Sequence, residues 1–192
     1  MINIGYGRAA GALSDLIGQR IVLTSPQVEL YSIEQVREAL NQILKGEVAS
    51  VQQVFTGPVS GHALLLISRE GADVLTSLLI DEKTIAAEGR AARREALAEV
   101  GNIVLQGSLG VCGNLLQIHV SFSVPSLALE TVDDLLNSIT IEEKELQFAL
   151  LVRTRFELLQ SQVSGYLVVV LGITSVSKLL EELDRWEERQ GI

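Results

Sequence analysis

The chain has 192 residues, of which 47% are hydrophobic, and its formal net charge is -9 at pH 7, with an isoelectric point near 4.7. The length and the apolar content are sufficient for a folded protein with a substantial core. The negative charge argues against nucleic acid as a partner, because proteins that bind the phosphate backbone present a basic face.

Apolar stretches in the chain are too short to predict a membrane-spanning helix, which needs about 20 apolar residues in succession. The longest, YLVVVLGI at 166–173, is rich in β-branched residues and predicts a strand buried on both faces. The N-terminal residues lack the basic and apolar regions of a secretory signal. The single cysteine, Cys112, permits no internal disulfide. We therefore expect a cytoplasmic protein without a membrane partner.

An internal repeat is the most informative feature of the sequence. Residues 3–40 align without a gap on residues 102–139. The identical pairs are Asn3 and Asn102, Ile4 and Ile103, Gly11 and Gly110, Leu16 and Leu115, Pro26 and Pro125, and Leu30 and Leu129. One interpretation is an old duplication with consequences only for architecture. The other is that duplicated positions, Asn3 and Asn102 first among them, mark duplicated sites.

The first repeat, about 1–82, is predicted to start with a helix and to end with a helix. Its elements in chain order are a helix at about 6–18, a strand at 21–25, a helix at about 33–44, strands at 48–57 and 59–68, and a helix at about 71–80. Pro26 is predicted to end the first strand, because proline cannot donate a hydrogen bond to a β ladder. The short turn between the last two strands favours an antiparallel hairpin.

The second repeat, about 83–192, has the same predicted order. Its elements are a helix at about 84–117, a strand at 119–124, a helix at 132–138, strands at 145–159 and 162–172, and a helix at about 174–189. A lone repeat would leave its sheet poorly covered. We therefore expect a single α+β domain in which two pseudo-twofold-related repeats share a largely antiparallel central sheet flanked by long helices.

The long helix of the second repeat contains an unfavourable pair, Gly101 and Asn102. An interior glycine costs about 1 kcal/mol relative to alanine, and asparagine competes for backbone hydrogen bonds. At 100° per residue, one stripe of this helix holds Glu95, Glu99, Asn102 and Gln106, and the opposite face holds Leu97, Val100, Val104, Gly107 and Val111. Gly101 falls at the side, where its missing Cβ would let another backbone come close.

Glu99 and Asn102 are three residues apart, so their side chains are neighbours on the helix surface. A carboxamide can orient a water molecule but cannot take its proton, whereas a carboxylate can anchor a cation on a partner. This division suits phosphoryl hydrolysis, which depends on positioning and charge stabilisation. The alternative is that both residues only make an exposed helix face soluble.

The segments EVGNI (99–103) and NIGYGRAAGALSDLIGQRIVLTSPQV (3–28), with the doubled VSG-apolar strands, resemble the CheC/CheX/FliY family of chemotaxis phosphatases. The resemblance covers essentially the whole chain, and its length and duplication are most like CheC. The family motif is Asp or Ser, three residues, Glu, two residues, Asn. Glu95, Glu99 and Asn102 occupy these positions, with Glu95 in place of the family's Asp or Ser.

The resemblance implies a hydrolase that removes the aspartyl phosphate from a phosphorylated CheY-type response regulator. Glu99 would pair with a lysine of the regulator, and Asn102 would direct water at phosphorus. The protein would need no cofactor of its own, and a divalent metal, Mg²⁺, would belong to the regulator. His62 and His119 are solitary in the sequence, and one cysteine cannot build a thiolate metal site.

The first repeat offers a degenerate second site at Asn3, because the position three residues earlier precedes Met1. Either the protein has one competent site, or the first helix begins before Met1. The incomplete site motivates an alternative function, a non-catalytic adaptor or binding module for the receptor deamidase CheD or for a flagellar-switch component. GYGRAAG (5–11) misses the dinucleotide fingerprint by one residue. Its small residues, with Gly107, Gly110 and Gly113, instead predict close helix packing.

Overall fold

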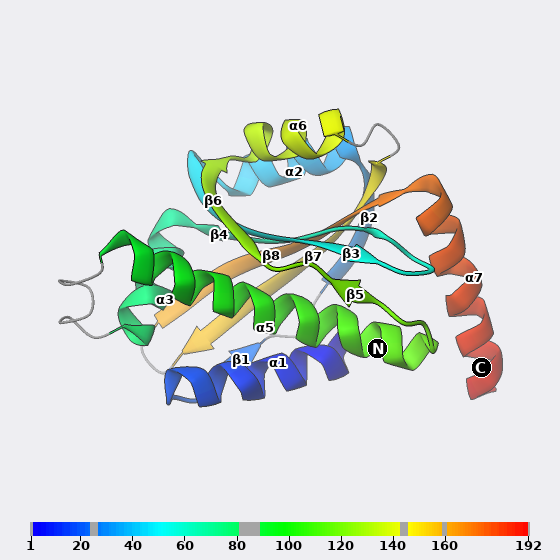
Figure 1. Cartoon of the computed structure of the whole chain (residues 1–192), viewed down its shortest axis with the longest axis horizontal. Helices are drawn as coiled ribbons and strands as arrows, with labels where there is room; N and C mark the ends of the chain where they lie inside the picture. Colours follow the sequence, from blue (N-terminus) through cyan, green and yellow to red (C-terminus); the bar gives the residue numbers. More distant parts are fainter. Residues whose placement is uncertain (1, 24–26, 81–88, 143–145, 159–160, 192) are drawn as a thin grey trace.

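The computed structural model describes residues 2–23, 27–80, 89–142, 146–158 and 161–191, which form an eight-stranded antiparallel sheet with helices on both faces (Figure 1). The first repeat contains α1 (Ile2–Ile17), β1 (Val22–Leu23), β2 (Gln27–Ser32), α2 (Ile33–Ile43), β3 (Glu47–Thr56), β4 (Gly61–Ser68) and α3 (Arg69–Leu79). The second contains α5 (Arg90–Leu116), β5 (Ser121–Phe122), β6 (Ser126–Thr131), α6 (Val132–Glu142), β7 (Leu146–Leu158), β8 (Ser161–Gly172) and α7 (Ile173–Gln190). The predicted α+β class is confirmed.

The strand order interleaves the two repeats. Along the sheet the order is β1-β7-β8-β4-β3-β5, with β2 also paired to β7 and β6 also paired to β3. The central pair, β4 and β8, joins equivalent strands of the two repeats. The first strands of each repeat therefore pair with the hairpin of the other repeat: β1 and β2 pair with β7, and β5 and β6 pair with β3. The repeat boundary predicted near residue 82 lies outside the described residues, and the division into units of 1–82 and 83–192 stays a prediction.

Two hydrophobic clusters cover the two faces of the sheet. One lies between the sheet and the layer of α1, α3 and α5, and the other lies beneath α2 and α6 (Figure 1). Neighbouring residues of β8 alternate between them, with Leu167 in the first and Val168 in the second. The prediction of a strand buried on both faces at 166–173 is thus confirmed for 166–171, whereas Ile173 is exposed and begins α7. Full burial of such a side chain stabilises the fold by about 1.5–3 kcal/mol.

The sequence pattern does not predict two of the strands, β2 and β6. No strand is predicted between Pro26 and the next helix or between Pro125 and the next helix, but β2 and β6 begin directly after these prolines and pair with β7 and β3. The strand predicted at 119–124 is reduced to the two-residue β5, whereas the predicted strand at 21–25 contains β1 and its last two residues lie outside the described residues. The reason is that proline prevents hydrogen bonding only at its own position, so an edge strand resumes one residue later.

Helix boundaries agree with the predictions to within about two residues, except that α1 begins at Ile2 and α6 continues to Glu142. The predicted start of α5 at about 84 lies outside the described residues. Among the described helices, α5 alone has the length and apolar content of a membrane span, which the sequence pattern did not indicate. Its most apolar stretch is 44% buried inside the fold, and the helix packs against α1 and β3. Core packing therefore accounts for its apolar residues.

Candidate functional site

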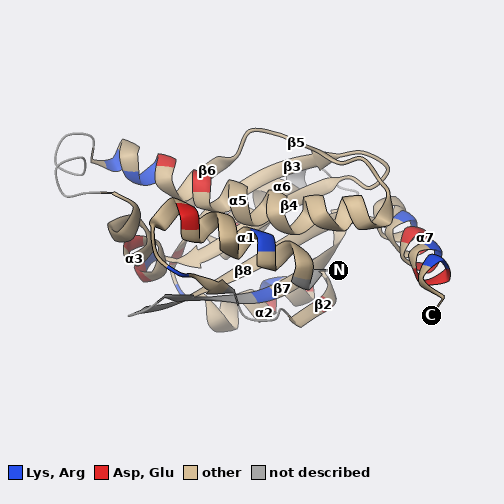
Figure 2. Cartoon of the chain, turned by 90° about the horizontal axis from the view of Figure 1, so that it is seen from below, with Lys and Arg blue, Asp and Glu red and all other residues tan. Residues whose placement is uncertain are grey.

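Helix α5 presents a polar stripe beside the core, as the helical spacing predicts. Glu95, Glu99 and Gln106 are exposed and Asn102 is half-buried. On the opposite face Leu97, Val100, Val104 and Val111 are buried, and Gly107 is half-buried. Charged residues of α5 occur only in its N-terminal half, where basic residues are followed by acidic ones (Figure 2). The stripe is therefore acidic at its start and uncharged from Asn102 onward.

At Gly101 helix α5 packs directly against strand β3. A Cβ on this residue would overlap the side chain of Val51. The neighbour is a side chain and not a backbone, so the predicted partner is wrong and the predicted close approach is correct. Because Gly101 has no side chain, α5 packs close to the sheet. The side chain of the next residue, Asn102, can therefore form a hydrogen bond with a residue of β3.

The carboxamide of Asn102 accepts a hydrogen bond from a buried glutamine on the core side of α5. Gln53 is only 1% exposed, and its Nε2 donates a 3.2 Å hydrogen bond to Oδ1 of Asn102. The same Nε2 donates to the backbone carbonyl oxygen of Ser123 at 2.9 Å. Gln106, one turn further along α5, donates to the same Oδ1 at 2.6 Å. Two donors thus fix the orientation of the Asn102 amide.

The direction of these hydrogen bonds follows from the carbonyl of Ser123, which can only accept. Gln53 must turn Nε2 toward it, so the second hydrogen of Nε2 is available only to an acceptor, Oδ1 of Asn102. Oε1 of Gln53 has no hydrogen-bond partner among the described residues. With its oxygen occupied, Asn102 has its Nδ2 left as a donor. Within the described chain no acceptor engages that nitrogen.

Gln53 was not among the predicted site residues, although the sequence holds a signal for it. Side chains alternate along a strand, so Val51, Gln53 and Phe55 share the face that packs beneath α5. A lone glutamine between two core residues is unusual, because a buried amide that lacks a hydrogen bond costs about 1–3 kcal/mol. The alternating pattern therefore predicts that Gln53 is buried and needs a hydrogen-bond partner. That this partner is Asn102 follows only from the three-dimensional structure.

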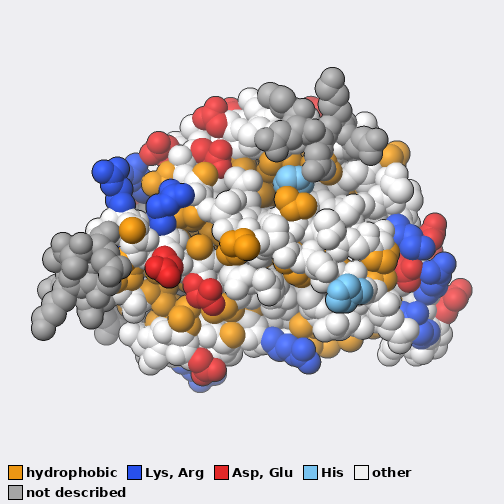
Figure 3. All heavy atoms as spheres, viewed as in Figure 1, with side chains coloured by type: hydrophobic (Ala, Val, Ile, Leu, Met, Phe, Trp, Pro, Cys, Tyr) orange, Lys and Arg blue, Asp and Glu red, His pale blue; other side chains and the backbone are white. Residues whose placement is uncertain are grey.

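The two carboxylates of the stripe remain available to a partner. Glu99 and Glu95 are exposed, and within the described residues neither forms a salt bridge. Acidic side chains are visible over α5 on this face, between hydrophobic surface residues (Figure 3). Glu99 lies three residues before Asn102, about 4.5 Å along the helix axis. The structure therefore places an unpaired acid and an oriented amide beside each other at the surface.

Helix α1, which carries Asn3 in its first turn, packs along α5 (Figure 1). A Cβ at Gly5 would lie 2.8 Å from the carbonyl oxygen of Gly107, so the predicted close helix packing is correct for these two glycines. It is wrong for Gly7, Gly11 and Gly110, which face open space, whereas Gly113 adjoins Ile118 and Val120 after the helix. The side chain of Asn3 lies outside the described residues, and its role as a degenerate site stays a prediction.

No alternative reactive centre gathers in the part of the chain that the structure describes. There, no three His, Cys, Asp or Glu side chains lie close enough to hold a metal ion. His62 is buried in β4, and His119 is exposed, with its Nε2 3.4 Å from Oγ of Ser121. Burial raises the pKa of the Cys112 thiol, which disfavours the reactive thiolate. The polar stripe of α5 is therefore the strongest candidate site.

Comparison with known proteins identifies the fold. No family model matches the sequence. FliY of Thermotoga maritima matches at 21% identity over 96% of this chain and 92% of that chain, with a TM-score of 0.72. FliM of H. pylori, solved in complex with FliG, matches at 13% identity over 94% and 93%, with a TM-score of 0.58. CheX of Borrelia burgdorferi, solved in complex with CheY, BeF₃ and Mg²⁺, matches at 18% identity over 89% and 98%, with a TM-score of 0.54. The chain has the fold of the CheC/CheX/FliY-type chemotaxis proteins.

Proposed function

We propose that this protein docks on a phosphorylated CheY-type receiver domain and promotes hydrolysis of its aspartyl phosphate. The observation that carries the proposal is the exposed carboxylate of Glu99 beside the amide of Asn102, which Gln53 orients from inside the core. The shared fold supports it, because one protein with this fold, a CheX, was solved in complex with CheY. A cytoplasmic location and a likeness to CheC in particular remain predictions.

In this mechanism Glu99 is the anchor and Asn102 is the group that positions water. The carboxylate of Glu99 pairs with a cationic side chain of the receiver. Nδ2 of Asn102 donates a hydrogen bond to a water oxygen and leaves the other lone pair directed at phosphorus. Water attacks as the bond from phosphorus to the aspartyl oxygen breaks, so the receiver recovers its carboxylate and inorganic phosphate leaves. The loose transition state requires positioning more than a strong base.

The charge stabilisation in this reaction comes from the partner. A divalent metal, Mg²⁺, is assigned to the receiver in this proposal, and the chain contributes only its own side chains. Because an amide does not titrate near neutral pH, Asn102 keeps the same hydrogen-bonding capacity across the physiological range. Glu95, at the first position of the polar stripe, is proposed to support docking through its negative charge.

The lifetime of the phosphorylated receiver tests the proposal. We expect the wild-type protein to shorten that lifetime and Asn102→Ala to lose most of the effect, on the order of 100-fold. Asn114→Ala is a matched control, because Asn114 is an exposed asparagine on the same helix. Equal lifetimes with the wild type and Asn102→Ala would remove the mechanism.

A non-catalytic adaptor is the second candidate function. It is favoured by the likeness to FliM, which was solved with FliG, and by Asn102 having its oxygen already occupied within the chain. The partner would be a flagellar-switch component or CheD. Pull-downs with a receiver domain, FliG and CheD, combined with a phosphate-release assay, separate the two functions. Binding of any of them without phosphate release would favour the adaptor.

A further inference from the structure

A second amide, that of Gln106, adjoins Asn102 on the polar stripe of α5. Gln106 is exposed, and its Nε2 donates a 2.6 Å hydrogen bond to Oδ1 of Asn102, one turn earlier on the helix. Within the described residues Gln106 forms no other hydrogen bond. Its carbonyl oxygen, Oε1, is therefore an acceptor at the surface that no donor of the described chain engages.

The direction of the Gln106 amide follows from a series of hydrogen bonds that starts at the backbone. The carbonyl oxygen of Ser123 can only accept, so it receives Nε2 of Gln53, and Gln53 then donates to Oδ1 of Asn102. Because Oδ1 is also an acceptor, the atom of Gln106 that meets it must be the donor, Nε2. Two atoms of the joined amides remain for an outside group. They are the donor Nδ2 of Asn102 and the acceptor Oε1 of Gln106.

We propose, on the basis of the proposed function, that Gln106 is a second residue that positions the attacking water. Oε1 of Gln106 accepts one hydrogen of the water, and Nδ2 of Asn102 donates to one lone pair of its oxygen. A single hydrogen bond lets a water molecule rotate, whereas two such bonds direct its second lone pair at phosphorus.

Neither amide takes a proton from the water in this reaction. The new bond between oxygen and phosphorus forms as the bond from phosphorus to the aspartyl oxygen breaks. The protons of the water stay on the inorganic phosphate or pass to solvent. Gln106 therefore contributes direction and not basicity, as a glutamine does in other phosphoryl hydrolases.

The surroundings of Gln106 suit an anionic phosphoryl group. No charged residue follows Glu99 in α5, so the helix surface from Asn102 to Gln106 carries no like charge that would repel phosphate oxygens. A Cβ at Gly110, one turn beyond Gln106, would meet no atom within 4 Å. This part of the helix surface is therefore open to a partner.

Gln106→Met removes both hydrogen-bonding atoms at nearly constant length. With a phosphorylated receiver domain as substrate, we expect kcat to fall roughly 2- to 10-fold through loss of the hydrogen bond to water. KM should change little, because Glu99 still anchors the receiver. Urea unfolding should show an unchanged midpoint, since Gln106 is exposed. Gln190→Met, which replaces an exposed glutamine on α7, is the matched control and should keep both kinetic constants.

Two further substitutions distinguish contact with water from mere support of Asn102. Gln106→Glu keeps an acceptor, and Gln106→Lys keeps only a donor. The phosphoryl group is charged before and during the reaction, so the added charges should act mainly on KM and leave kcat comparable. We expect Gln106→Glu to retain more of kcat than Gln106→Met, and Gln106→Lys to be as slow as Gln106→Met. A wild-type kcat in Gln106→Lys, or a kcat in Gln106→Glu as low as in Gln106→Met, would overturn the proposal.

Asn102→Ala, measured in parallel, separates failure of this inference from failure of the proposed function. If the wild type is faster than Asn102→Ala and Gln106→Met equals the wild type, only the role of Gln106 is overturned. If the wild type and Asn102→Ala do not differ, the proposed function fails and the role of Gln106 fails with it.

Discussion

Gln53, buried in strand β3, donates a 3.2 Å hydrogen bond from its side chain to Oδ1 of Asn102 on helix α5. This contact joins the hydrophobic core to the polar surface stripe. It also answers why an alanine-rich helix carries Gly101 and Asn102 side by side. Gly101 brings the helix onto Val51, and Asn102 then meets Gln53 two residues along the same strand face.

Replacing Gln53 tests whether the buried amide orients Asn102. Gln53→Met keeps the shape and removes the donor, so Asn102 should lose its fixed direction while the fold remains. We expect dephosphorylation of the receiver to slow by about tenfold, because small misplacements of a positioning group carry costs of this order. Turnover and substrate affinity are measured separately, and the decrease should fall mainly on turnover.

Gln52→Met is the matched control for that experiment. Gln52 is the preceding residue, its side chain points to the opposite face of β3, and its Nε2 donates to Glu130 at 3.1 Å. The control should leave the activity unchanged. Equal activity losses in the two variants would mean that general damage to β3, and not the orientation of Asn102, causes the effect.

A methyl group at Gly101 should destabilise the protein even though alanine is the better helix former. The new Cβ would overlap Val51, and overpacking of this kind costs about 1–3 kcal/mol. Gly110→Ala on the same helix faces open space and should instead stabilise by roughly 0.5–1 kcal/mol. Urea unfolding measures both free energies. A neutral Gly101→Ala would show that α5 and β3 are farther apart than described.

The double variant Gly101→Ala/Val51→Ala checks that the two residues interact directly. Because Val51→Ala makes room for the added methyl, the cost of Gly101→Ala should shrink in its presence, giving a coupling free energy of about 0.5–3 kcal/mol. Additive free energies would contradict a direct steric contact. The same samples can be assayed for dephosphorylation, since displacement of α5 should also displace Asn102 from Gln53.

The sequence predicts those features that depend on local periodicity. The apolar run of β8 and the two faces of α5 follow from side-chain spacing alone, and the structure agrees with both. Edge strands β2 and β6 carry a weaker signal, because they pair on one side only and follow proline. The contact of Gln53 with Asn102 joins residues 49 positions apart, so no local pattern could reveal it.

Neutralising Glu99 should weaken docking on the receiver. Glu99→Gln keeps the shape and removes the charge, and an exposed ion pair contributes about 0.2–1 kcal/mol, so we expect a rise in Kd of roughly 1.4- to fivefold. The difference should shrink as salt is raised, because salt screens exposed charges. Glu187→Gln on α7, an exposed glutamate away from the stripe, is the control. A salt-independent loss would indicate packing at the interface, not charge pairing.

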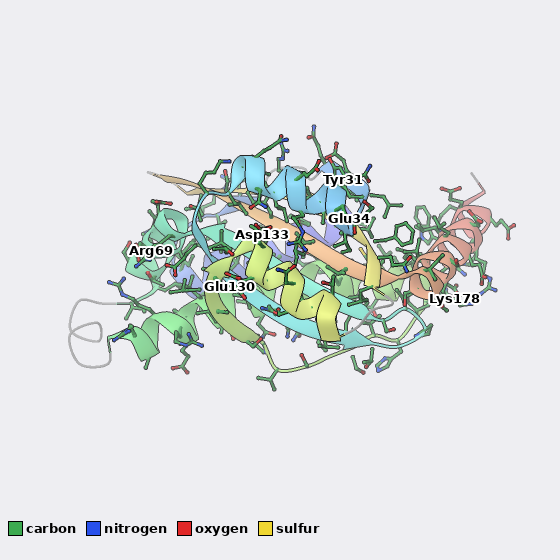
Figure 4. The ribbon with its side chains drawn as sticks, turned by 90° about the horizontal axis from the view of Figure 1, so that it is seen from above. Tyr31, Glu34, Arg69, Glu130, Asp133 and Lys178 are labelled. Carbon is green, nitrogen blue, oxygen red and sulfur yellow. The ribbon has the colours of Figure 1, made fainter. Side chains whose placement is uncertain are left out.

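Acid should weaken the contact between helices α2 and α6 on the far side of the sheet. Figure 4 looks onto this face, where Asp133 of α6 accepts from Asn41 at 3.0 Å and from Arg37 at 3.1 Å. Hydrogen bonds from Asn41 and Arg37 hold the pKa of Asp133 below its usual value. A carboxyl group whose pKa is lower in the folded state stabilises the protein above the unfolded-state pKa. That contribution disappears as the pH falls through the folded-state pKa.

Asp133→Asn isolates this contribution. At neutral pH the variant should unfold at a lower urea concentration than the wild type, and the difference should diminish as the pH falls through the lowered folded-state pKa of Asp133, where the wild-type carboxyl takes up its proton. Asp134→Asn is the control, because Asp134 neighbours Asp133 on α6 but accepts from Thr131, the residue directly before its own helix, and has no contact with α2 among the described residues. A difference between wild type and Asp133→Asn that stays constant with pH would show that the contact depends on shape and not on charge.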